Sequence, residues 1–274
     1  MPLILAALIL AGQQPVPGTE TRYHIDESMR APTTRPVWAD EFSGTRLDAR
    51  KWSVETAYNK PGWFNNERQY YAAENLTVTG GVLTITGRRE DLSKRTDWGG
   101  QPYSSGRITT RGHASWTYGF YEIRAKLPCS PGTWPAIWMM PDAEAPWPTA
   151  GEIDIMEAVG SQPNVVHATL HTEKFVHSKN TQRGAQLPLA TNCSAFHRYQ
   201  MEWSPQAITI GVDDRAYFRV ASDMPGDRGA WPFDGPFHLI LNLAIGGDWP
   251  GRVDDAQLPQ RMQVDYVRVW GRVR

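Results

Sequence analysis

The sequence contains few cysteines, only Cys129 and Cys193 among 274 residues. Neither has a partner at the spacing of metal ligands, so the sequence argues against a zinc site. In an exported protein, an even pair of cysteines indicates one disulfide. Two free thiols are the alternative, because geometry decides whether a bridge forms and the sequence does not supply it.

The chain also lacks a strong charge imbalance and a long apolar run. Its formal net charge is −1 and no basic run stands out, so we do not expect a nucleic-acid partner. Residues 3–11 are continuously apolar, which is too short for a membrane span and suits the core of a signal peptide. We therefore expect a signal-peptide core within residues 1–11 and a secreted or periplasmic protein, with no membrane partner after signal removal. A misassigned start is the alternative.

No segment shows a helical period over three turns. Alternating or wholly apolar segments between turn residues predict strands instead. They cover residues 76–79, 82–86, 121–127, 207–212, 215–220, 237–245 and 262–270. Residues 121–127 alternate strictly, which predicts one buried and one solvated face, whereas 237–245 predicts a strand buried on both faces. We expect an all-β protein with a flexible, proline-rich leader over 12–36 and a single domain of two packed antiparallel sheets over 37–274.

Tryptophan, glycine and proline are abundant, with 12, 24 and 21 residues. Glycine and proline suit many short strands joined by turns. So many tryptophans exceed what one core needs, which predicts that some of them line a surface that stacks flat, weakly polar rings.

Three carboxylates lie close together in the segment GEIDIMEAVG, Gly151–Gly160. The surrounding apolar residues predict a half-buried strand, in which Glu152 and Asp154 share a face. Glu157 would point to the opposite face unless a β-bulge near Ile155–Met156 returned it to the first. We predict that bulge, because three acids at this spacing have no structural use on a plain strand. The structural alternative is a solvated strand face.

Paired carboxylates on one surface can break a glycosidic bond. One protonates the leaving oxygen, and the other attacks the anomeric carbon or activates water. Asp154, between the two glutamates, can hydrogen-bond the nucleophile. We expect its negative charge, with that of the ionised glutamate, to raise the pKa of the remaining acid.

The acidic segment, with Trp147-Pro148 before it, resembles the signature of glycoside hydrolase family sixteen in its bulged, laminarinase-type form. Further stretches agree with that family. They are NNERQYY (65–71), GFYEIRAKLP (119–128), GTWPAIWMMP (132–141), NLAIGGDWPG (242–251), ADEFSG (39–44) and VDYVRVW (264–270). The resemblance implies a β-jelly-roll with a concave sheet and an open substrate cleft. It assigns Glu152 as nucleophile, Asp154 as assisting acid and Glu157 as acid/base, with retention of anomeric configuration.

The resemblance also implies substrate-binding and metal positions. We expect Trp134 or Trp138 to stack on sugar rings, and give the same role with less support to Trp147 and Trp249. From their residue types, Asn65, Glu67 and Arg107 could supply hydrogen bonds to sugar hydroxyls, with the satisfaction of loop backbone groups as the alternative. The resemblance implies that His171 binds substrate or tunes Glu157. No metal site is expected at His167, His171 and His177, because no cysteine or acid joins them at ligand spacing. A structural calcium is suggested at Glu41, Gly81 and Asp265. Asp248 stands where the family often has Asn and could alter pH dependence.

These features predict a retaining endo-glycosidase that hydrolyses internal β-1,3 linkages of laminarin-like glucans, including mixed β-1,3/1,4-glucans. Hydrolysis of another β-linked polysaccharide such as agar, transglycosylation, and non-catalytic β-glucan binding are the alternatives. We expect a monomer whose partner is the polysaccharide, and no cofactor for catalysis.

Overall fold

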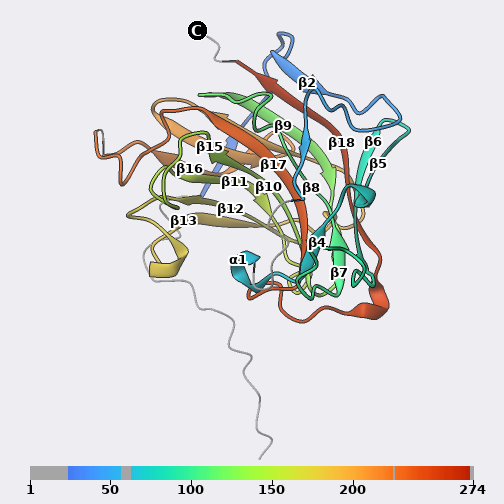
Figure 1. Ribbon diagram of the computed structural model, residues 1–274. Coiled ribbons are helices and arrows are strands. Elements are labelled where there is room, and N and C mark those ends of the chain that lie inside the picture. Colours follow the sequence, from blue (N-terminus) through green and yellow to red (C-terminus); the bar gives the residue numbers. More distant parts are fainter. Residues whose placement is uncertain (1–23, 57–62, 225, 272–274) are drawn as a thin grey trace, which may run out of the picture.

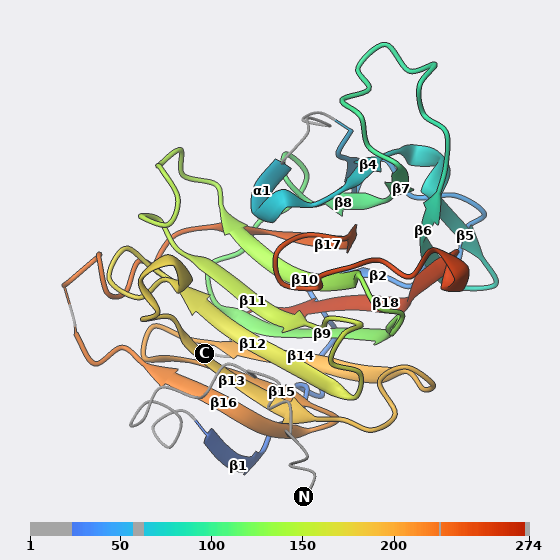
Figure 2. The ribbon, with the colours of Figure 1, turned by 90° about the horizontal axis from the view of Figure 1, so that it is seen from below.

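The computed structural model describes residues 24–56, 63–224 and 226–271. Two β-sheets pack face to face, as Figures 1 and 2 show. Apolar side chains from both sheets form one large core cluster, with Ile123 and Met201 from one sheet and Ile153 and Leu241 from the other. This arrangement confirms the predicted all-β jelly-roll of two sheets.

The larger sheet has eleven strands in the path β1-β16-β15-β14-β9-β18-β6-β7-β4, with β2 paired to β18 and β5 to β6. Its strands are β1 (His24–Ser28), β2 (Trp38–Asp40), β4 (Gln69–Tyr71), β5 (Leu76–Thr79), β6 (Val82–Arg89), β7 (Tyr103–Ser105), β9 (Gly119–Lys126), β14 (His197–Trp203), β15 (Ala207–Val212), β16 (Arg215–Ala221) and β18 (Gln260–Trp270). All pairs are antiparallel, as predicted, except β4 with β7 at one edge, which run parallel.

The smaller sheet has seven strands in the order β13-β12-β11-β10-β17-β8-β3. They are β3 (Ser53–Val54), β8 (Arg107–Thr109), β10 (Thr133–Pro141), β11 (Glu152–Glu157), β12 (Val165–His171), β13 (Arg183–Pro188) and β17 (Phe237–Ile245). In the described residues, helices are limited to α1 (Trp63–Asn66) and the 3-10 turns η2 (Ala73–Asn75), η3 (His177–Lys179) and η4 (Asp255–Gln257). The smaller sheet carries the three acids on β11, between β12 and β10.

Two predicted hairpins are present. Gly80 and Gly81 join β5 to β6, and Asp213 and Asp214 join β15 to β16, all four with positive φ. Such two-residue turns match the twist of antiparallel strands and require left-handed backbone, which Gly and Asp tolerate. Strand β17 is buried along its whole length, as predicted.

The solvated face expected for residues 121–127 is wrong at its first position. Glu122 is only 4% exposed. Its carboxylate accepts hydrogen bonds from Gln200 Nε2 at 2.7 Å and from the Tyr266 hydroxyl at 2.8 Å. Alternation marks which side of the strand a residue occupies, but it does not reveal that long neighbouring side chains cover that side.

The leader prediction also needs correction. Strand β1, within the segment assigned to a flexible leader, pairs antiparallel with β16, and Met29 is buried against Phe120 and Trp270. Residues 24–36 therefore belong to the fold. The predicted signal-peptide core lies outside the described residues.

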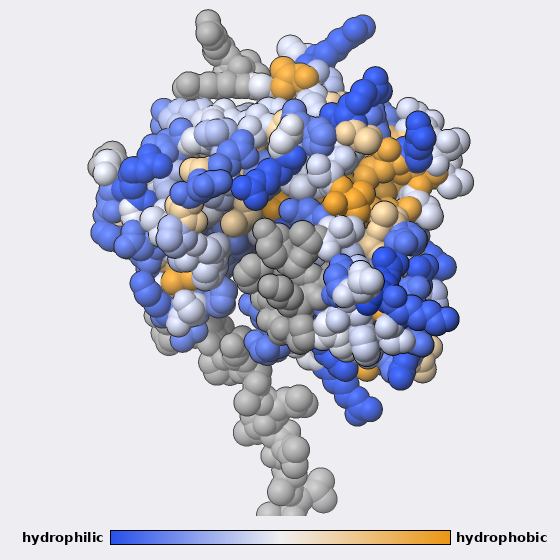
Figure 3. Space-filling model, in the orientation of Figure 1, coloured by the Kyte–Doolittle hydropathy of each residue, from blue (hydrophilic) through white to orange (hydrophobic). Residues whose placement is uncertain are grey.

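Cys129 and Cys193 form a disulfide, which confirms the bridged alternative and ties the loop after β9 to the loop before β14. Hydrophilic side chains predominate on the face shown in Figure 3, with an apolar area toward one side. Among the large hydrophobic side chains of the described residues, Val37, Trp98, Trp147 and Met224 are exposed. None of the described helices is long and apolar enough to cross a membrane.

Candidate active site

A β-bulge in β11 brings the three acids to one face. Asp154 pairs with Thr169 of β12 and Glu157 pairs with His167 of β12. An advance of three residues along β11 therefore matches an advance of two residues along β12. The same irregularity appears against β10. Ile153, Ile155 and Met156 point into the core. The predicted bulge is confirmed, and it leaves both glutamates half-buried on the opposite, acid-bearing face.

Each glutamate accepts a hydrogen bond from a tryptophan. Trp147 Nε1 donates to Glu152 Oε2 at 2.7 Å, and Trp134 Nε1 donates to Glu157 Oε1 at 3.0 Å. Trp147, which is 43% exposed, lies in the loop between β10 and β11, whereas Trp134 lies on β10 itself. One oxygen of each carboxylate is therefore held by an indole N–H.

The two glutamates differ in the pKa that their surroundings impose. Burial raises the pKa of Glu152 to about 7, and the hydrogen bonds from Trp147 and Asp154 oppose that rise. Burial and then the charge of Glu152 raise the pKa of Glu157 to about 8. Glu157 thus holds a proton at neutral pH more firmly than Glu152 does, as a general acid requires beside an ionised partner.

Asp154 is 3% exposed, and its surroundings disfavour a charge. Burial, followed by the charges of Glu152 and Glu157, raises its pKa well above the usual range. The surroundings of Asp154 therefore favour its protonated form, and its side chain is hydrogen-bonded to Glu152. This corrects the expectation that a negative charge on Asp154 raises the pKa of the remaining acid, because the charges that raise the pKa of Glu157 are those of Glu152 and Glu67.

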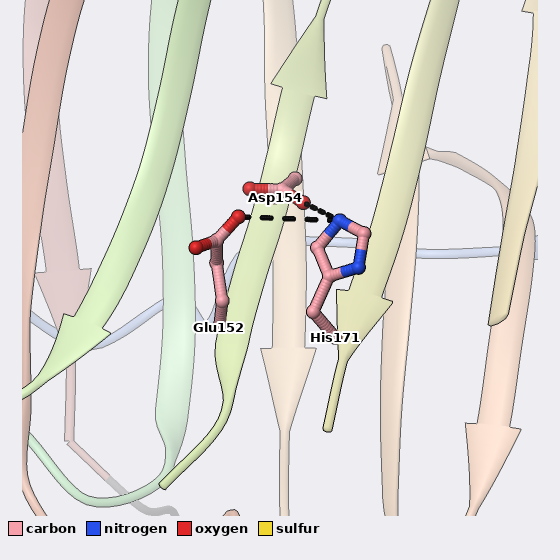
Figure 4. A group of neighbouring side chains, drawn as sticks. All are labelled: Glu152, Asp154 and His171. Atoms are coloured by element: carbon pink, nitrogen blue, oxygen red, sulfur yellow. Dashed lines mark ion pairs between the residues drawn. The ribbon is translucent and has the colours of Figure 1, made fainter. Parts of the chain in front are cut away.

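His171 lies on β12 directly opposite Glu152, as Figure 4 shows with Asp154 beside it. Its Nε2 is 3.4 Å from Asp154 Oδ2 and 4.0 Å from Glu152 Oε1. Burial, and then the nearby His177, lowers its pKa to about 3, so the imidazole is neutral. His171 thus adjoins the Glu152 end of the strand, whereas His167 faces Glu157. The expected tuning of Glu157 by His171 does not follow from this arrangement.

Trp138 and Arg107 extend the site across the sheet. The Arg107 guanidinium lies 5.0 Å from the Trp138 ring centroid and pairs with Glu55. Trp138 Nε1 donates to Asn242 Oδ1 at 2.7 Å. A cation beside a half-buried indole ring forms a surface suited to a sugar ring and its hydroxyls.

Glu67 is a further half-buried carboxyl group of this site. It accepts a hydrogen bond from Gln69 Nε2 at 2.7 Å and is also hydrogen-bonded to Asn65. Burial raises its pKa to about 7. Its charge contributes to the raised pKa of Glu157, which places Glu67 near the acid/base.

The loop after β17 crosses the last residues of α1. The Asp248 amide donates to Asn65 O at 2.9 Å, and Asn66 Nδ2 donates to both oxygens of Asp248 at 3.0 Å. Gly247 has φ +123° at this crossing, and a Cβ there would lie 2.9 Å from Asn65 O, so only glycine fits. Trp249 then packs edge-on against Trp134, with ring centroids 5.3 Å apart. Asp248 thus joins this loop to α1, which is a structural use that the sequence reasoning did not foresee.

The residues suggested for calcium are engaged otherwise. Glu41 accepts two hydrogen bonds from Arg268, at 2.8 and 2.9 Å, and Asp265 pairs with Arg124 at 2.5 Å. Gly81 lies in the β5–β6 turn. These ion pairs engage the two carboxylates, whereas the predicted calcium site requires backbone carbonyls and one carboxylate, so the calcium site stays a prediction.

Sequence reasoning missed several residues of this face. Asn242 is one of two polar residues inside the otherwise apolar β17, and that interruption was a usable signal. His167 packs edge-on against Trp249 at 4.9 Å, and His177 lies 5.4 Å from Trp147. The reason given against a metal site at the histidines, the lack of a nearby acid, is wrong, because Glu152 and Asp154 join His171 from the neighbouring strand. Cross-strand neighbours cannot be found from spacing along one segment.

Two glutamates on one face of a β-sandwich, with different pKa values and aromatic rings around them, define a glycoside hydrolase of the jelly-roll type. The sequence profile of Glycosyl hydrolases family 16 matches residues 62–268. The chain belongs to this family, whose reaction needs no cofactor.

The similar proteins cover nearly the whole fold. The Beta-glucanase of Rhodothermus marinus is 47% identical over 259 residues, which cover 89% of this chain and 88% of that protein. The X-ray structure of the laminarinase from Rhodothermus marinus has a TM-score of 0.82 at 46% identity and covers 89% of this chain and 100% of that chain. SCLam, a non-specific endo-β-1,3(4)-glucanase of the same family, has a TM-score of 0.87 at 48% identity, covering 92% of this chain and 97% of that chain.

Proposed function

We propose that this protein is a retaining endo-β-1,3-glucanase that hydrolyses laminarin-like glucans and accepts mixed β-1,3/1,4-glucans. The observation that carries the proposal is the bulge in β11, which places Glu152, Asp154 and Glu157 on one face. The similarity to beta-glucanase, laminarinase and endo-β-1,3(4)-glucanase supports the choice of glucan.

The proposed reaction is a double displacement. Glu157 gives its proton to the glycosidic oxygen while Glu152 attacks the anomeric carbon, so the aglycone leaves and a covalent glycosyl-enzyme forms. The ionised Glu157 then takes a proton from water, whose oxygen attacks the same carbon and releases Glu152. The higher pKa of Glu157 supports this division of roles. Asp154, protonated, donates a hydrogen bond that holds the attacking carboxylate.

Substrate binding is assigned to the aromatic and polar residues around the acids. In this proposal Trp138, with Arg107 beside it, stacks on one sugar ring, and Asn65 and Glu67 bind hydroxyls of the same segment. His171 is neutral and can exchange a hydrogen bond with a sugar at the Glu152 side. Trp134, Trp147 and Trp249 border the scissile bond, and two of them hold the glutamates through their N–H groups.

A polysaccharide panel tests the proposal. Laminarin, curdlan, lichenan, agarose and carrageenan are scored by new reducing ends, and viscosity distinguishes internal from terminal cleavage. We expect laminarin to be cleaved fastest, lichenan more slowly, and the galactans not at all. Cleavage of agarose alone would replace the glucanase assignment with that of a galactan hydrolase. Binding of laminarin without cleavage would make the protein a glucan-binding protein.

Proton NMR of the first product tests the stereochemistry. Retention predicts that the β-anomer appears first and mutarotates later, whereas an initial α-anomer means inversion. The same experiment at high acceptor concentration separates hydrolysis from transglycosylation, because longer products would then accumulate.

We further propose that the protein is exported and acts as a monomer. The Cys129–Cys193 disulfide supports an oxidising compartment, where such bonds persist. Fractionation of the natural host and light scattering test these two points. Calcium binding at Glu41, Gly81 and Asp265 stays a prediction, which the arginine pairs disfavour. A melting temperature that rises with calcium and falls with a chelator would support it.

A further inference from the structure

Glu152, Asp154 and His171 point toward one another across two adjacent strands (Figure 4). Three potential ligand atoms, one from each side chain, lie within 4.8 Å of one another. The backbone pairing of β11 and β12 fixes this arrangement, since Glu152 and His171 are direct cross-strand partners. The cluster therefore does not depend on a mobile loop.

Two buried atoms of this cluster have no hydrogen-bond partner among the described residues. They are Asp154 Oδ2 and His171 Nδ1. Asp154 is 3% exposed and His171 is 6% exposed. Asp154 Oδ2 points toward His171 Nε2 at 3.4 Å without forming an aligned hydrogen bond. An unpartnered carboxylate oxygen at this depth is costly unless a donor or a cation completes its surroundings.

The spacing of the ligand atoms suits a small transition-metal ion. Ligand atoms about 2.0–2.1 Å from a tetrahedral Zn²⁺ lie about 3.3–3.4 Å from one another. The separation of His171 Nε2 and Asp154 Oδ2, 3.4 Å, has this value. Glu152 Oε1 is 4.0 Å from the same nitrogen and is the oxygen that Trp147 leaves free, so a small side-chain rotation completes the set.

The donor types also select the metal. Once Asp154 has released its proton to the solvent, one imidazole nitrogen with two carboxylate oxygens is a set that Zn²⁺ and Cu²⁺ accept. Calcium takes six to eight oxygen ligands, and this cluster does not offer them. Because two of the three ligands are the nucleophile and its hydrogen-bond partner in the proposed reaction, a bound metal and a bound glucan exclude each other.

We propose that Glu152, Asp154 and His171 form an inhibitory site for Zn²⁺ that is distinct from any structural calcium. Zinc occupies the position of the reacting sugar, and glucan displaces it. Part of this inference, the inhibition of catalysis, rests on the proposed function. The binding of zinc itself does not.

Calorimetric titration of the full chain with ZnCl₂, after treatment with EDTA and dialysis, tests the binding. We expect one site in the wild type and at least about tenfold weaker binding in His171→Asn and in Asp154→Asn, since each loses a ligand. His177→Asn is the matched control, because His177 lies 5.1 Å from His171, ring to ring, but outside the cluster. Circular dichroism and melting curves verify that the variants fold, and His171→Gln is a second variant should His171→Asn fail to fold.

Wild-type zinc affinity in both His171 variants, or loss of binding in His177→Asn alone, would overturn the proposal. CaCl₂ at the same concentrations should not compete with zinc, and competition would also overturn it. In kinetic assays zinc should raise the apparent KM for laminarin and leave kcat unchanged, with full recovery after EDTA. Inhibition that lowers kcat at constant KM would show that zinc acts elsewhere. If laminarin is not a substrate, the calorimetric result still stands alone.

Discussion

Glu122 and Asp154 are two carboxylic acids at nearly the same depth, one in each sheet, with opposite surroundings. Glu122 is 4% exposed, and both of its oxygens accept hydrogen bonds, from Gln200 and Tyr266. Asp154 is 3% exposed, has an unpartnered oxygen, and lies beside two further acids. Burial alone therefore does not identify a functional acid. Incomplete hydrogen bonding and crowding with like charges do, because a purely structural site would have no reason to keep them.

The largest expected effect is the loss of turnover when a glutamate of the smaller sheet, which carries the reacting groups, is replaced. Glu152→Gln and Glu157→Gln should each lower the turnover of laminarin by about three orders of magnitude or more, since each removes a reacting group. Reducing-end assays measure the loss, and equilibrium binding of laminarin oligosaccharides should persist.

Glu122→Gln is the matched control for these variants. It should leave turnover near that of the wild type but lower the free energy of unfolding by about 1–3 kcal/mol. The reason is that the amide introduced at position 122 accepts the hydrogen bond from Gln200 less well than the carboxylate does. Near-normal turnover in either catalytic variant, or a large loss of turnover in Glu122→Gln, would break the comparison.

The second prediction tests the protonation of Asp154. If Asp154 acts as a neutral donor to Glu152, then Asp154→Asn preserves the donor and Asp154→Ala does not. We expect Asp154→Ala to lower kcat/KM about 100-fold and Asp154→Asn to lower it only about tenfold. Equal losses in the two variants would mean that Asp154 works through its charge.

The third prediction uses stability against pH. Burial raises the pKa of Glu157 from 4.5 to about 8 in the folded state. The folded protein therefore binds more protons than the unfolded chain between these values, and this contribution to stability is present below pH 4.5 and is lost as pH rises toward 8. Buried histidines such as His171, with a lowered pKa, act in the opposite direction at lower pH.

Glu157→Gln isolates the effect of the acid from that of the histidines. Relative to this variant, the wild type should lose about 3–4 kcal/mol of unfolding free energy between pH 5 and pH 8. Urea denaturation at several pH values measures the difference. Parallel stability curves for the two proteins would show that Glu157 is not protonated in the folded state.

The contrast between Glu122 and Asp154 also explains which features of the structure can be predicted from the sequence. The bulge, the hairpins and the buried β17 can be predicted from local patterns, because side-chain periodicity and turn type depend on consecutive residues of one segment. The cover over Glu122, the pairing of His171 with Glu152 and the use of Asp248 by Asn66 join segments far apart in the chain. Such partners depend on strand order and loop crossing, which spacing within a motif does not contain. The resemblance to family sixteen supplied the candidate residues, but not which tryptophan holds which glutamate.

The smallest expected effect concerns Trp147 and Trp134. It is tested by the direction in which each variant shifts the pH profile of kcat/KM, rather than by the size of the shift. Trp147→Phe and Trp134→Phe keep an aromatic ring and remove the N–H donated to Glu152 and to Glu157. Each hydrogen bond lowers the pKa of its glutamate, so its loss raises that pKa. In the profile of kcat/KM against pH, Glu152 must be ionised and Glu157 protonated. Trp147→Phe should therefore move the acid limb to higher pH, with about a tenfold loss on that limb.

Trp134→Phe should move the basic limb to higher pH instead, so that this variant retains activity where the wild type declines. The two variants are controls for each other, because both remove one indole N–H at the same face of the sheet. A loss of activity that is equal at every pH would indicate that these rings act only by stacking on the sugar. A shift of the same limb in both variants would mean that the two glutamates share their protons so closely that the roles of nucleophile and acid cannot be divided between the two ends of β11.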